Sequence, residues 1–340
     1  MMIRKFALTA IASALLFSVN AHAGLTANQA FQQFNAVVLT DINSSSHLHG
    51  RTWAGGNVVG GEYVHRTLPT SDYAGLTALG SISNARVLQN GAVIKGSLSQ
   101  TEINGGSSAI FGAASNTNFQ GPTYVAGATS GINFNGGRVL DYTSNATLQA
   151  SVGASESTNF ANLLSTTSNF LSTLSNTSSV SINGGKATFN ATADANGLAV
   201  FNLSDLDAAN IFSKGEFDFN LGSATTVIIN AALVDIDISA NFLGGSAQKI
   251  AGNVIWNFYN AETVDFGRQF GGNVLAYKAN LTNYADIEGS VFVNKLTQRG
   301  QIHQFAFLGD IPVAAVPEPS SYAMLLAGLA LMGFVARRRS

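Results

Sequence analysis

The sequence of 340 residues contains no cysteine, and charged residues make up only 11% of it. Without cysteine the chain can form no disulfide bond, so its packed core and its backbone hydrogen bonds must hold the fold together. Residues 24–316 contain 12 Lys and Arg against 18 Asp and Glu, which gives this part a net charge of −6. The sequence therefore offers no basic patch, and we expect no nucleic acid as a partner.

Motifs that carry catalysis are also missing. The sequence contains no nucleophile elbow, no Walker loop, no H-E-x-x-H and no dinucleotide fingerprint. Its glycine pairs, such as Gly184-Gly185, stand between strand-like segments and indicate turns rather than phosphate-binding loops. We therefore expect no catalytic residues and no enzymatic activity.

The amino-terminal segment, residues 1–23, has the features of a secretory signal peptide. Arg4 and Lys5 precede an apolar run, and the segment ends with Ala21-His22-Ala23. Small residues at Ala21 and Ala23 are typical of a cleavage site, so we predict export through the Sec translocon and cleavage by signal peptidase after Ala23. The alternative is an uncleaved membrane anchor.

The carboxy-terminal segment, residues 317–340, combines a rigid marker, an uncharged run over residues 322–336 and a basic cluster. The marker and the cluster consist of Pro317, Glu318, Pro319, Arg337, Arg338 and Arg339. A helix over the uncharged run would measure roughly 22 Å, against about 30 Å for a bilayer core. We therefore predict a marginal transmembrane helix over about residues 320–336, with the arginines in the cytoplasm. The alternative is an ordinary core helix.

This tail closely resembles the PEP-CTERM sorting signal, which occurs in Gram-negative bacteria that make exopolysaccharide. The resemblance implies that an exosortase, a membrane protease-transpeptidase, processes the chain near Pro317. It therefore predicts an exported protein that is anchored transiently in the inner membrane and then reaches the cell surface or the extracellular matrix.

The segment between the two ends reads as short strands separated by glycine-rich turns. Units of a glycine, a small polar residue and a strand start recur, and they begin at Gly56, Gly80, Gly96, Gly252, Gly272 and Gly289. Stacked β-coils produce such a repeat, because no coil can bury its apolar side alone. We predict an all-β fold with a β-helix-like (solenoid) body; the alternative is a glycine-rich β-sandwich.

One segment, residues 151–176, interrupts the β pattern. Its apolar residues fall at helical spacing, and they are Phe160, Leu163, Leu164, Phe170, Leu171 and Leu174. We predict one flanking amphipathic helix over about residues 155–176, capped by Ser155 or Ser157, that covers an apolar surface of the β stack. After it, Asn183-Gly184 predicts the turn of a β-hairpin.

Several short motifs stand along this body, namely FNAVVL at 34–39, AGGNV at 54–58, TVIIN at 226–230, GNVIWNF at 252–258, GNVLAY at 272–277 and IEGSVF at 287–292. With them, residues 28–310 resemble the choice-of-anchor A domain, a bacterial surface module. The resemblance implies a β-helix-like fold with a flanking helix and no established enzymatic activity. We expect this domain to cover residues 24–311, followed by a linker over residues 312–316.

Two histidines are candidate metal ligands. The segment His47-Leu48-His49 would place two imidazoles on one face of a strand. Two ligands do not make a metal site, and His65 or His303 could join them only if the fold brought them close. The plainer interpretation is a solvated loop, and we predict no metal there.

Carboxylates alternate with apolar residues in two strands and so share one face of each. Asp235 and Asp237 form one such pair, and Glu216 and Asp218 form the other. Carboxylates on one face can bind calcium or perform acid–base chemistry on sugars, but they also form the wet side of a half-buried strand. We expect these carboxylates to form the wet side of their strands and expect no cofactor; the alternative is that they bind calcium.

These features together predict a non-enzymatic surface or matrix protein with a structural or adhesive role in the exopolysaccharide or biofilm layer. One alternative is a carbohydrate-binding or ice-binding-like module that uses a flat β-helix face. Its sugar-stacking surface could include Trp53 and Tyr63, although a core position fits such aromatic residues better. Another alternative is a glycan-active enzyme that uses the carboxylates.

Overall fold

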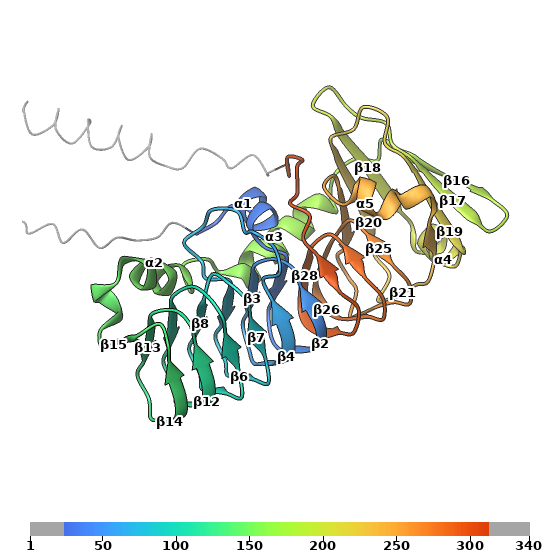
Figure 1. The fold of residues 1–340 in the computed structure, drawn as a ribbon. Coiled ribbons are helices and arrows are strands. Elements are labelled where there is room, and N and C mark those ends of the chain that lie inside the picture. The colour runs from blue at the N-terminus through green and yellow to red at the C-terminus, as the bar shows by residue number, and fades with distance from the viewer. Residues whose placement is uncertain (1–23, 313–340) are drawn as a thin grey trace, which may run out of the picture.

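The computed structural model of the chain describes residues 24–312, and these residues form a parallel β-solenoid with helices along one side (Figure 1). Twenty-five strands form one continuous sheet that winds around the solenoid, and all its pairings are parallel. The predicted solenoid is therefore confirmed, and the alternative β-sandwich is wrong, because a sandwich is built from antiparallel strands.

The strands stack into three faces. The first face contains β1 (Ala36–Val38), β3 (Thr52–Ala54), β5 (Leu76–Ala78), β8 (Ala92–Ile94), β11 (Ser108–Ile110), β13 (Thr123–Val125), β15 (Arg138–Val139), β18 (Leu198–Leu203), β20 (Thr226–Ala231), β23 (Val254–Phe258) and the first halves of β26 (Asn273–Asn283) and β28 (Val291–Gln298). The second face contains the second halves of β26 and β28, the first halves of β2 (Ile42–Leu48), β4 (Val58–Tyr63), β12 (Ala114–Phe119) and β14 (Thr129–Phe134), and all of β6 (Ile82–Ser83), β9 (Leu98–Ser99), β21 (Asp235–Ile238) and β24 (Thr263–Phe266). The third face contains the ends of β2, β4, β12 and β14 with β7 (Arg86–Val87), β10 (Glu102–Ile103), β25 (Phe270–Gly271), β27 (Ile287–Glu288) and β29 (Ile302–His303).

The first coil lies in the middle of the stack rather than at an end. On the first face, β1 pairs with β3 on one side and with β28 on the other. In Figure 1 the blue first coil accordingly separates the green coils of the amino-terminal half from the orange coils of the carboxy-terminal half. The chain therefore winds outward to β15, crosses to the far end, and winds back until its last coils close on its first.

The crossing is made by helices that lie against the first face. They are the 3-10 helix η1 (Tyr142–Ser144), α2 (Ala146–Ala154) and α3 (Phe160–Leu171). Together with α1 (Ala27–Gln33) they cover outward apolar side chains of the first face, including Val37, Leu275 and Phe292, in a second hydrophobic cluster outside the solenoid. The helices thereby shield strand residues that would otherwise expose apolar surface to water.

The predicted amphipathic helix over residues 155–176 is confirmed as α3, which is shorter and begins only at Phe160, whereas the separate helix α2 before it was not predicted. The Ser155 carbonyl accepts a hydrogen bond from Trp53 Nε1, and the Thr158 hydroxyl accepts one from Tyr73. Asn159, rather than either predicted serine, caps α3 by accepting a hydrogen bond from the Asn162 backbone. The polar segment between α2 and α3 therefore attaches these helices to the solenoid through hydrogen bonds.

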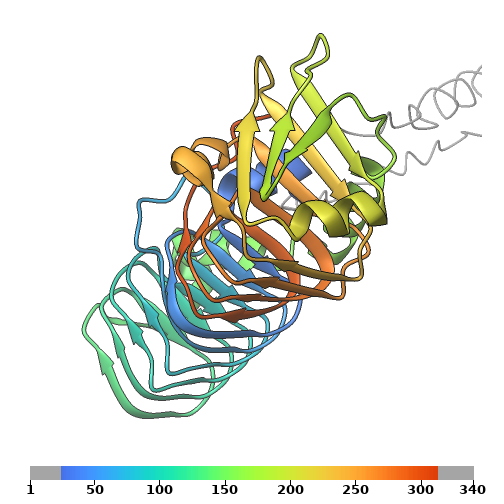
Figure 2. The same ribbon diagram turned by 90° about the vertical axis from the view of Figure 1, so that its right-hand side faces the viewer.

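A small second sheet lies at the far end of the solenoid, as Figure 2 shows in yellow and green. Its strands are β16 (Ser179–Asn183), β17 (Lys186–Asn190), β19 (Glu216–Asn220) and β22 (Asn241–Phe242), and α4 (Asp205–Phe212), η2 (Leu243–Gly245) and α5 (Ser246–Ile250) accompany it. The predicted hairpin turn is confirmed, because β16 and β17 pair antiparallel with Gly184 in a left-handed conformation. Phe189 and Phe217 from this sheet pack around the fully buried Trp256.

The interior of the solenoid is filled by aliphatic stacks, one side chain per coil, such as Ile42, Val58, Ile82, Leu98 and Ala114. The corner between the second and third faces is also repeated in five successive coils of the amino-terminal half. It uses one residue with positive φ, and these residues are Gly60, Asn84, Gln100, Asn116 and Gly131. Since only glycine and, less readily, asparagine favour this conformation, the corner explains part of the Gly and Asn content.

The predicted signal peptide and its cleavage site at Ala21 and Ala23 lie outside the described residues, as do the marker at 317–319, the helix over 320–336 and the arginines at 337–339. Among residues 24–312, no helix is long and apolar enough to cross a membrane.

Candidate functional site: an outward polar row and a histidine cluster

A row of outward side chains follows the second face through ten coils. In spatial order, the row consists of Asp237, Asp265, Thr282, Thr297, Asn43, Val59, Ser83, Ser99, Ser115 and Ser130. With about 4.8 Å between neighbouring strands, the row extends over roughly 43 Å. Nine of its ten side chains are short and polar, and we call this set the polar row.

The polar row is free of internal hydrogen bonding, unlike the residues beside it. Within residues 24–312, the hydroxyl groups of Ser83, Ser99 and Ser115 make no hydrogen bond to protein. By contrast, the side chains of Asn57 and Ser81 at the neighbouring corner each accept a hydrogen bond from the backbone of the next coil, at 2.8 and 3.0 Å. The corner residues therefore stabilise the stack, while the hydroxyls of the row can bind an external partner.

The carboxylates that the sequence singled out fall into separate places. Asp235 and Asp237 are exposed at one end of the second face, and Asp235 accepts a hydrogen bond from Thr263 at 2.6 Å. Glu216 and Asp218 lie in the small sheet instead, where Lys186 pairs with Asp218 at 3.4 Å. Each pair alternates with buried or half-buried apolar residues, as expected for the wet side of a strand.

The third face carries charged side chains in one line. His47, Glu62, Arg86 and Glu102 are strand partners in successive coils. Arg86 contacts both carboxylates, with Nη1 3.5 Å from Glu62 Oε1 and Nε 3.1 Å from Glu102 Oε2. Together with Ser44–Ser46 and the corner residues, these side chains line an open groove of about 570 Å³ between the second and third faces.

Four of the five histidines gather at the edge of this third face. The imidazole rings form a chain in which His303 contacts His49, His49 contacts His65, and His65 stacks on His47, with ring centroids 4.5, 5.5 and 4.5 Å apart. His47 and His49 flank the buried Leu48, as the alternation predicted, and the fold does bring His65 and His303 to them. The fifth, His22, lies outside the described residues.

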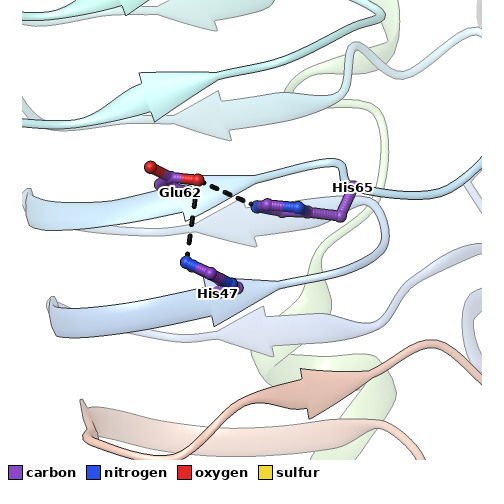
Figure 3. Close-up of side chains that lie close together, drawn as sticks. All are labelled: His47, Glu62 and His65. Atoms are coloured by element: carbon purple, nitrogen blue, oxygen red, sulfur yellow. Dashed lines mark ion pairs between the residues drawn. The ribbon is translucent and has the colours of Figure 1, made fainter.

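The histidine cluster divides into two halves with different partners. Gln301 Oε1 lies 3.1 Å from His49 Nε2 and 3.2 Å from His303 Nε2, and the buried Glu288 lies 2.9 Å from His303 Nδ1. His47 and His65 instead point at Glu62 (Figure 3). Burial, and then the neighbouring His47, lower the pKa of His65. Burial, and then His303, lower the pKa of His49.

The sequence did not indicate Glu62 or Glu288 as functional, and of the polar row it singled out only Asp237. A signal for the row was present, since Ser83 and Ser99 close two of the glycine-led repeat units that begin at Gly80 and Gly96.

The aromatic candidates proved to be core residues, because Trp53 and Tyr63 are 6% and 0% exposed. A sugar-stacking surface built on these two residues is therefore ruled out.

This architecture defines a class of protein, namely a parallel β-solenoid that presents flat polar faces. Residues 27–304 match the family of ice-binding-like adhesive domains, and because the match covers most of the sequence, the chain belongs to that family. Residues 315–339 match the PEP-CTERM protein-sorting motif, which confirms the sorting signal recognised from the marker and arginines. No curated protein and no solved structure matches the chain significantly.

The two matches agree on the kind of protein that this chain is. An adhesive domain followed by a sorting motif identifies an exported surface protein, and the motif implies an exosortase as the processing partner. The resemblance of residues 28–310 to the choice-of-anchor A domain stays a prediction.

Proposed function

We propose that this chain is a non-enzymatic adhesin of the exopolysaccharide layer, and that its polar row is the surface that binds polysaccharide. The observation that carries the proposal is the set of unpaired hydroxyl, amide and carboxylate groups in register along the second face. A flat row suits an extended polymer better than a small molecule, which requires a concave pocket.

The energetics of such a row favour a long ligand. A single hydroxyl contact contributes only about 0.5–1.5 kcal/mol, because it replaces a contact with water. A polymer that bridges several coils adds such contacts at high effective concentration, so its overall affinity can exceed that of any one contact by orders of magnitude. The net charge of −6 on residues 24–316 favours a neutral polymer over a strongly acidic one, since like charges repel.

The test is the binding of the purified exported protein to polysaccharide from a bacterium that makes this protein. A variant with Ser83→Ala, Ser99→Ala and Ser115→Ala removes three outward hydroxyls. We expect it to bind about tenfold or more weakly, since each lost contact contributes roughly 0.5–1.5 kcal/mol. The matched control, Ser144→Ala, Ser165→Ala and Ser172→Ala, removes three hydroxyls on or beside the helices and should bind like the unmodified protein. Equal binding by both triple variants would refute a role for the row.

We also propose that the tail holds the chain in the inner membrane only until the exosortase cuts near Pro317. Export through the Sec translocon and removal of residues 1–23 by signal peptidase would precede this step. The mass of the extracellular protein tests both cleavages: we expect it to begin at Gly24 and to lack residues 322–340. An extracellular form that still contains residues 322–340 would contradict the processing step.

Ice is the second ligand that the row could bind, as the family description suggests. The row places threonines in register at Thr282 and Thr297, but carboxylates follow at Asp265 and Asp237. Inhibition of ice recrystallisation by the same triple variants separates the two ligands. Loss of ice activity with unchanged polysaccharide binding would favour ice.

A further inference from the structure

His47, Glu62 and His65 form a compact set of metal-ligand side chains that the proposed adhesive function does not use. Within residues 24–312, they are the group of three such residues whose ligand atoms all lie within 4.8 Å of one another. Glu62 Oε2 is 3.2 Å from His65 Nε2 and 3.7 Å from His47 Nε2, and Figure 3 shows both rings directed at this carboxylate.

Among the residues that the structure describes, Glu62, at 3.2 Å, is the one polar partner of His65 Nε2. His65 Nε2 is buried from solvent and makes no hydrogen bond within the described residues, although Glu62 is near. A buried polar atom without a well-aligned hydrogen bond is rare in folded proteins, and a bound ion is one arrangement that would satisfy it. The other half of the cluster differs, because Gln301 and Glu288 already satisfy the ring nitrogens of His49 and His303.

We propose that His47, Glu62 and His65 bind a divalent transition metal ion of the zinc type. Two imidazoles and one carboxylate are ligands that zinc accepts, with bonds of about 2.0–2.2 Å. Ligand atoms around a tetrahedral zinc ion then lie roughly 3.3 Å apart, which is close to the observed distances to Glu62. Calcium fits poorly, since it prefers six or more oxygen ligands.

The second oxygen of Glu62 has its own support. Arg86 Nη1 lies 3.5 Å from Glu62 Oε1, and Arg86 is itself held by Glu102. A partner of this kind fixes the orientation of a ligating carboxylate, which strengthens metal binding. Within residues 24–312 only three protein ligands are present, so further coordination positions would face the open groove and would be filled by water or by an oxygen of a bound molecule.

The ion would join two coils and the loop that follows them. His47 in β2 and Glu62 in β4 are strand partners in neighbouring coils, whereas His65 comes just after β4 at the start of the long connection to β5. Because the metal would bind the folded state alone, it would raise the stability of the protein by mass action. The proposal does not depend on polysaccharide binding.

Calorimetric titration of the purified exported protein with zinc chloride tests the site. We expect one zinc ion per chain, and we expect His65→Asn or Glu62→Gln to weaken binding by about 100-fold or more, since even an outer partner of a ligand contributes 10–100-fold. The matched controls are His49→Asn, beside the site, and Glu262→Gln, at an exposed glutamate away from it; they change the same residue types and should keep the affinity within a few-fold. The chain has no cysteine that could bind zinc instead.

Two further measurements keep the test decisive if a variant fails to fold. Zinc should raise the melting temperature of the unmodified protein and of both controls. X-ray absorption of the zinc complex should show two imidazole ligands and otherwise oxygen. The proposal is overturned if no saturable binding occurs, if the two ligand variants bind like the controls, or if the bound ion has only oxygen ligands.

Discussion

Asn35 donates a hydrogen bond from Nδ2 to the carbonyl oxygen of Gly289, 2.8 Å away in space and 254 positions later in the chain. Its own Oδ1 accepts a hydrogen bond from the Gly50 backbone at 3.0 Å. One buried side chain therefore joins the first coil to a late coil of the carboxy-terminal half and to the next coil of the amino-terminal half. It holds the two halves of the solenoid together where β1 lies between β3 and β28.

Replacement of Asn35 by Ala should therefore weaken the junction between the two halves. It leaves the Gly289 carbonyl and the Gly50 amide without this partner, and each buried unsatisfied group costs about 1–3 kcal/mol. We expect the free energy of unfolding, measured in urea, to fall by about 2–4 kcal/mol.

The control for this junction is Asn210→Ala on the exposed surface of α4, which should change stability by less than about 0.5 kcal/mol. A loss of stability at Asn35 no larger than that of the control would show that strand pairing alone joins the halves.

A ladder of asparagines attaches α3 to the first face. Asn230 donates to Asn202, and Asn257 donates to Asn230, each at 2.8 Å. Asn257, which is fully buried, also accepts a hydrogen bond from the Ser168 hydroxyl of α3 at 2.6 Å. The amides thus satisfy one another along the stack and bind the helix at the same time.

A double-mutant cycle on Ser168→Ala and Asn257→Ala should show coupling. Groups in one hydrogen-bond network typically interact by about 0.5–3 kcal/mol, whereas independent sites add. We expect coupling of at least about 1 kcal/mol in the unfolding free energy, together with faster amide exchange in α3 for either single variant. Strictly additive losses would mean that helix packing by Leu164 and Leu171 is sufficient without the hydrogen bond.

The sequence predicted the repeating coil well, because glycine-led strand starts are a local signal. It could not predict where the stack begins. The pairing of Val37 with Phe292 joins residues far apart in the chain, and nothing local in either segment identifies the partner. The helix predicted over residues 155–176 began too early because apolar spacing does not report that Ser155 and Thr158 have tertiary partners.

The candidate site was predicted only in part for the same reason. Alternation around Leu48 placed His47 and His49 on one side of a strand. Whether His65 joins them depends on the register between β2 and β4, which contains an irregularity between Ser44 and His47. Coil length and such irregularities set the register, so the contact with Glu62 followed only from the fold.

The corner with positive φ makes Gln100 a position for stabilisation. Gln100 has a φ of 48°, a conformation that costs an ordinary residue roughly 1–2 kcal/mol. Glycine removes this strain but adds about 0.5–1 kcal/mol of backbone entropy to the unfolded chain. We therefore expect Gln100→Gly to raise the free energy of unfolding by about 0.5–1 kcal/mol.

Two control variants test whether backbone strain at Gln100 explains this stabilisation. Gln120→Gly changes an exposed glutamine without positive φ and should destabilise the protein by about 0.5–1 kcal/mol. Gly60→Ala places a methyl group against the Ser44 carbonyl at a positive φ and should destabilise it more. If Gln100→Gly and Gln120→Gly shift the urea midpoint in the same direction, the corner carries no strain.

Arg51 is buried to 2% exposure, and no carboxylate pairs with it among residues 24–312. Its guanidinium donates instead to the backbone carbonyls of Tyr73, Gln33 and Pro69, at 3.1, 3.1 and 3.0 Å. Burial lowers the pKa of Arg51 to about 10, so the group is still charged at neutral pH. The fork of donors therefore ties the end of α1 to the loop that precedes β5.

Arg51→Lys should show whether the three hydrogen bonds of the guanidinium, rather than its positive charge, stabilise this region. A lysine keeps the positive charge but cannot reach three carbonyls that surround a planar guanidinium, so charged hydrogen bonds of about 1.5–3 kcal/mol each are lost. We expect a loss of about 3 kcal/mol or more in unfolding free energy, and faster tryptic cleavage after the exposed Arg66, because the loop of residues 64–75 is no longer tied down. Arg138→Lys, at an exposed arginine, should change neither quantity. A cleavage rate unchanged by Arg51→Lys would mean that the contacts of Tyr73 with Phe34 and Thr158 hold the loop without the guanidinium.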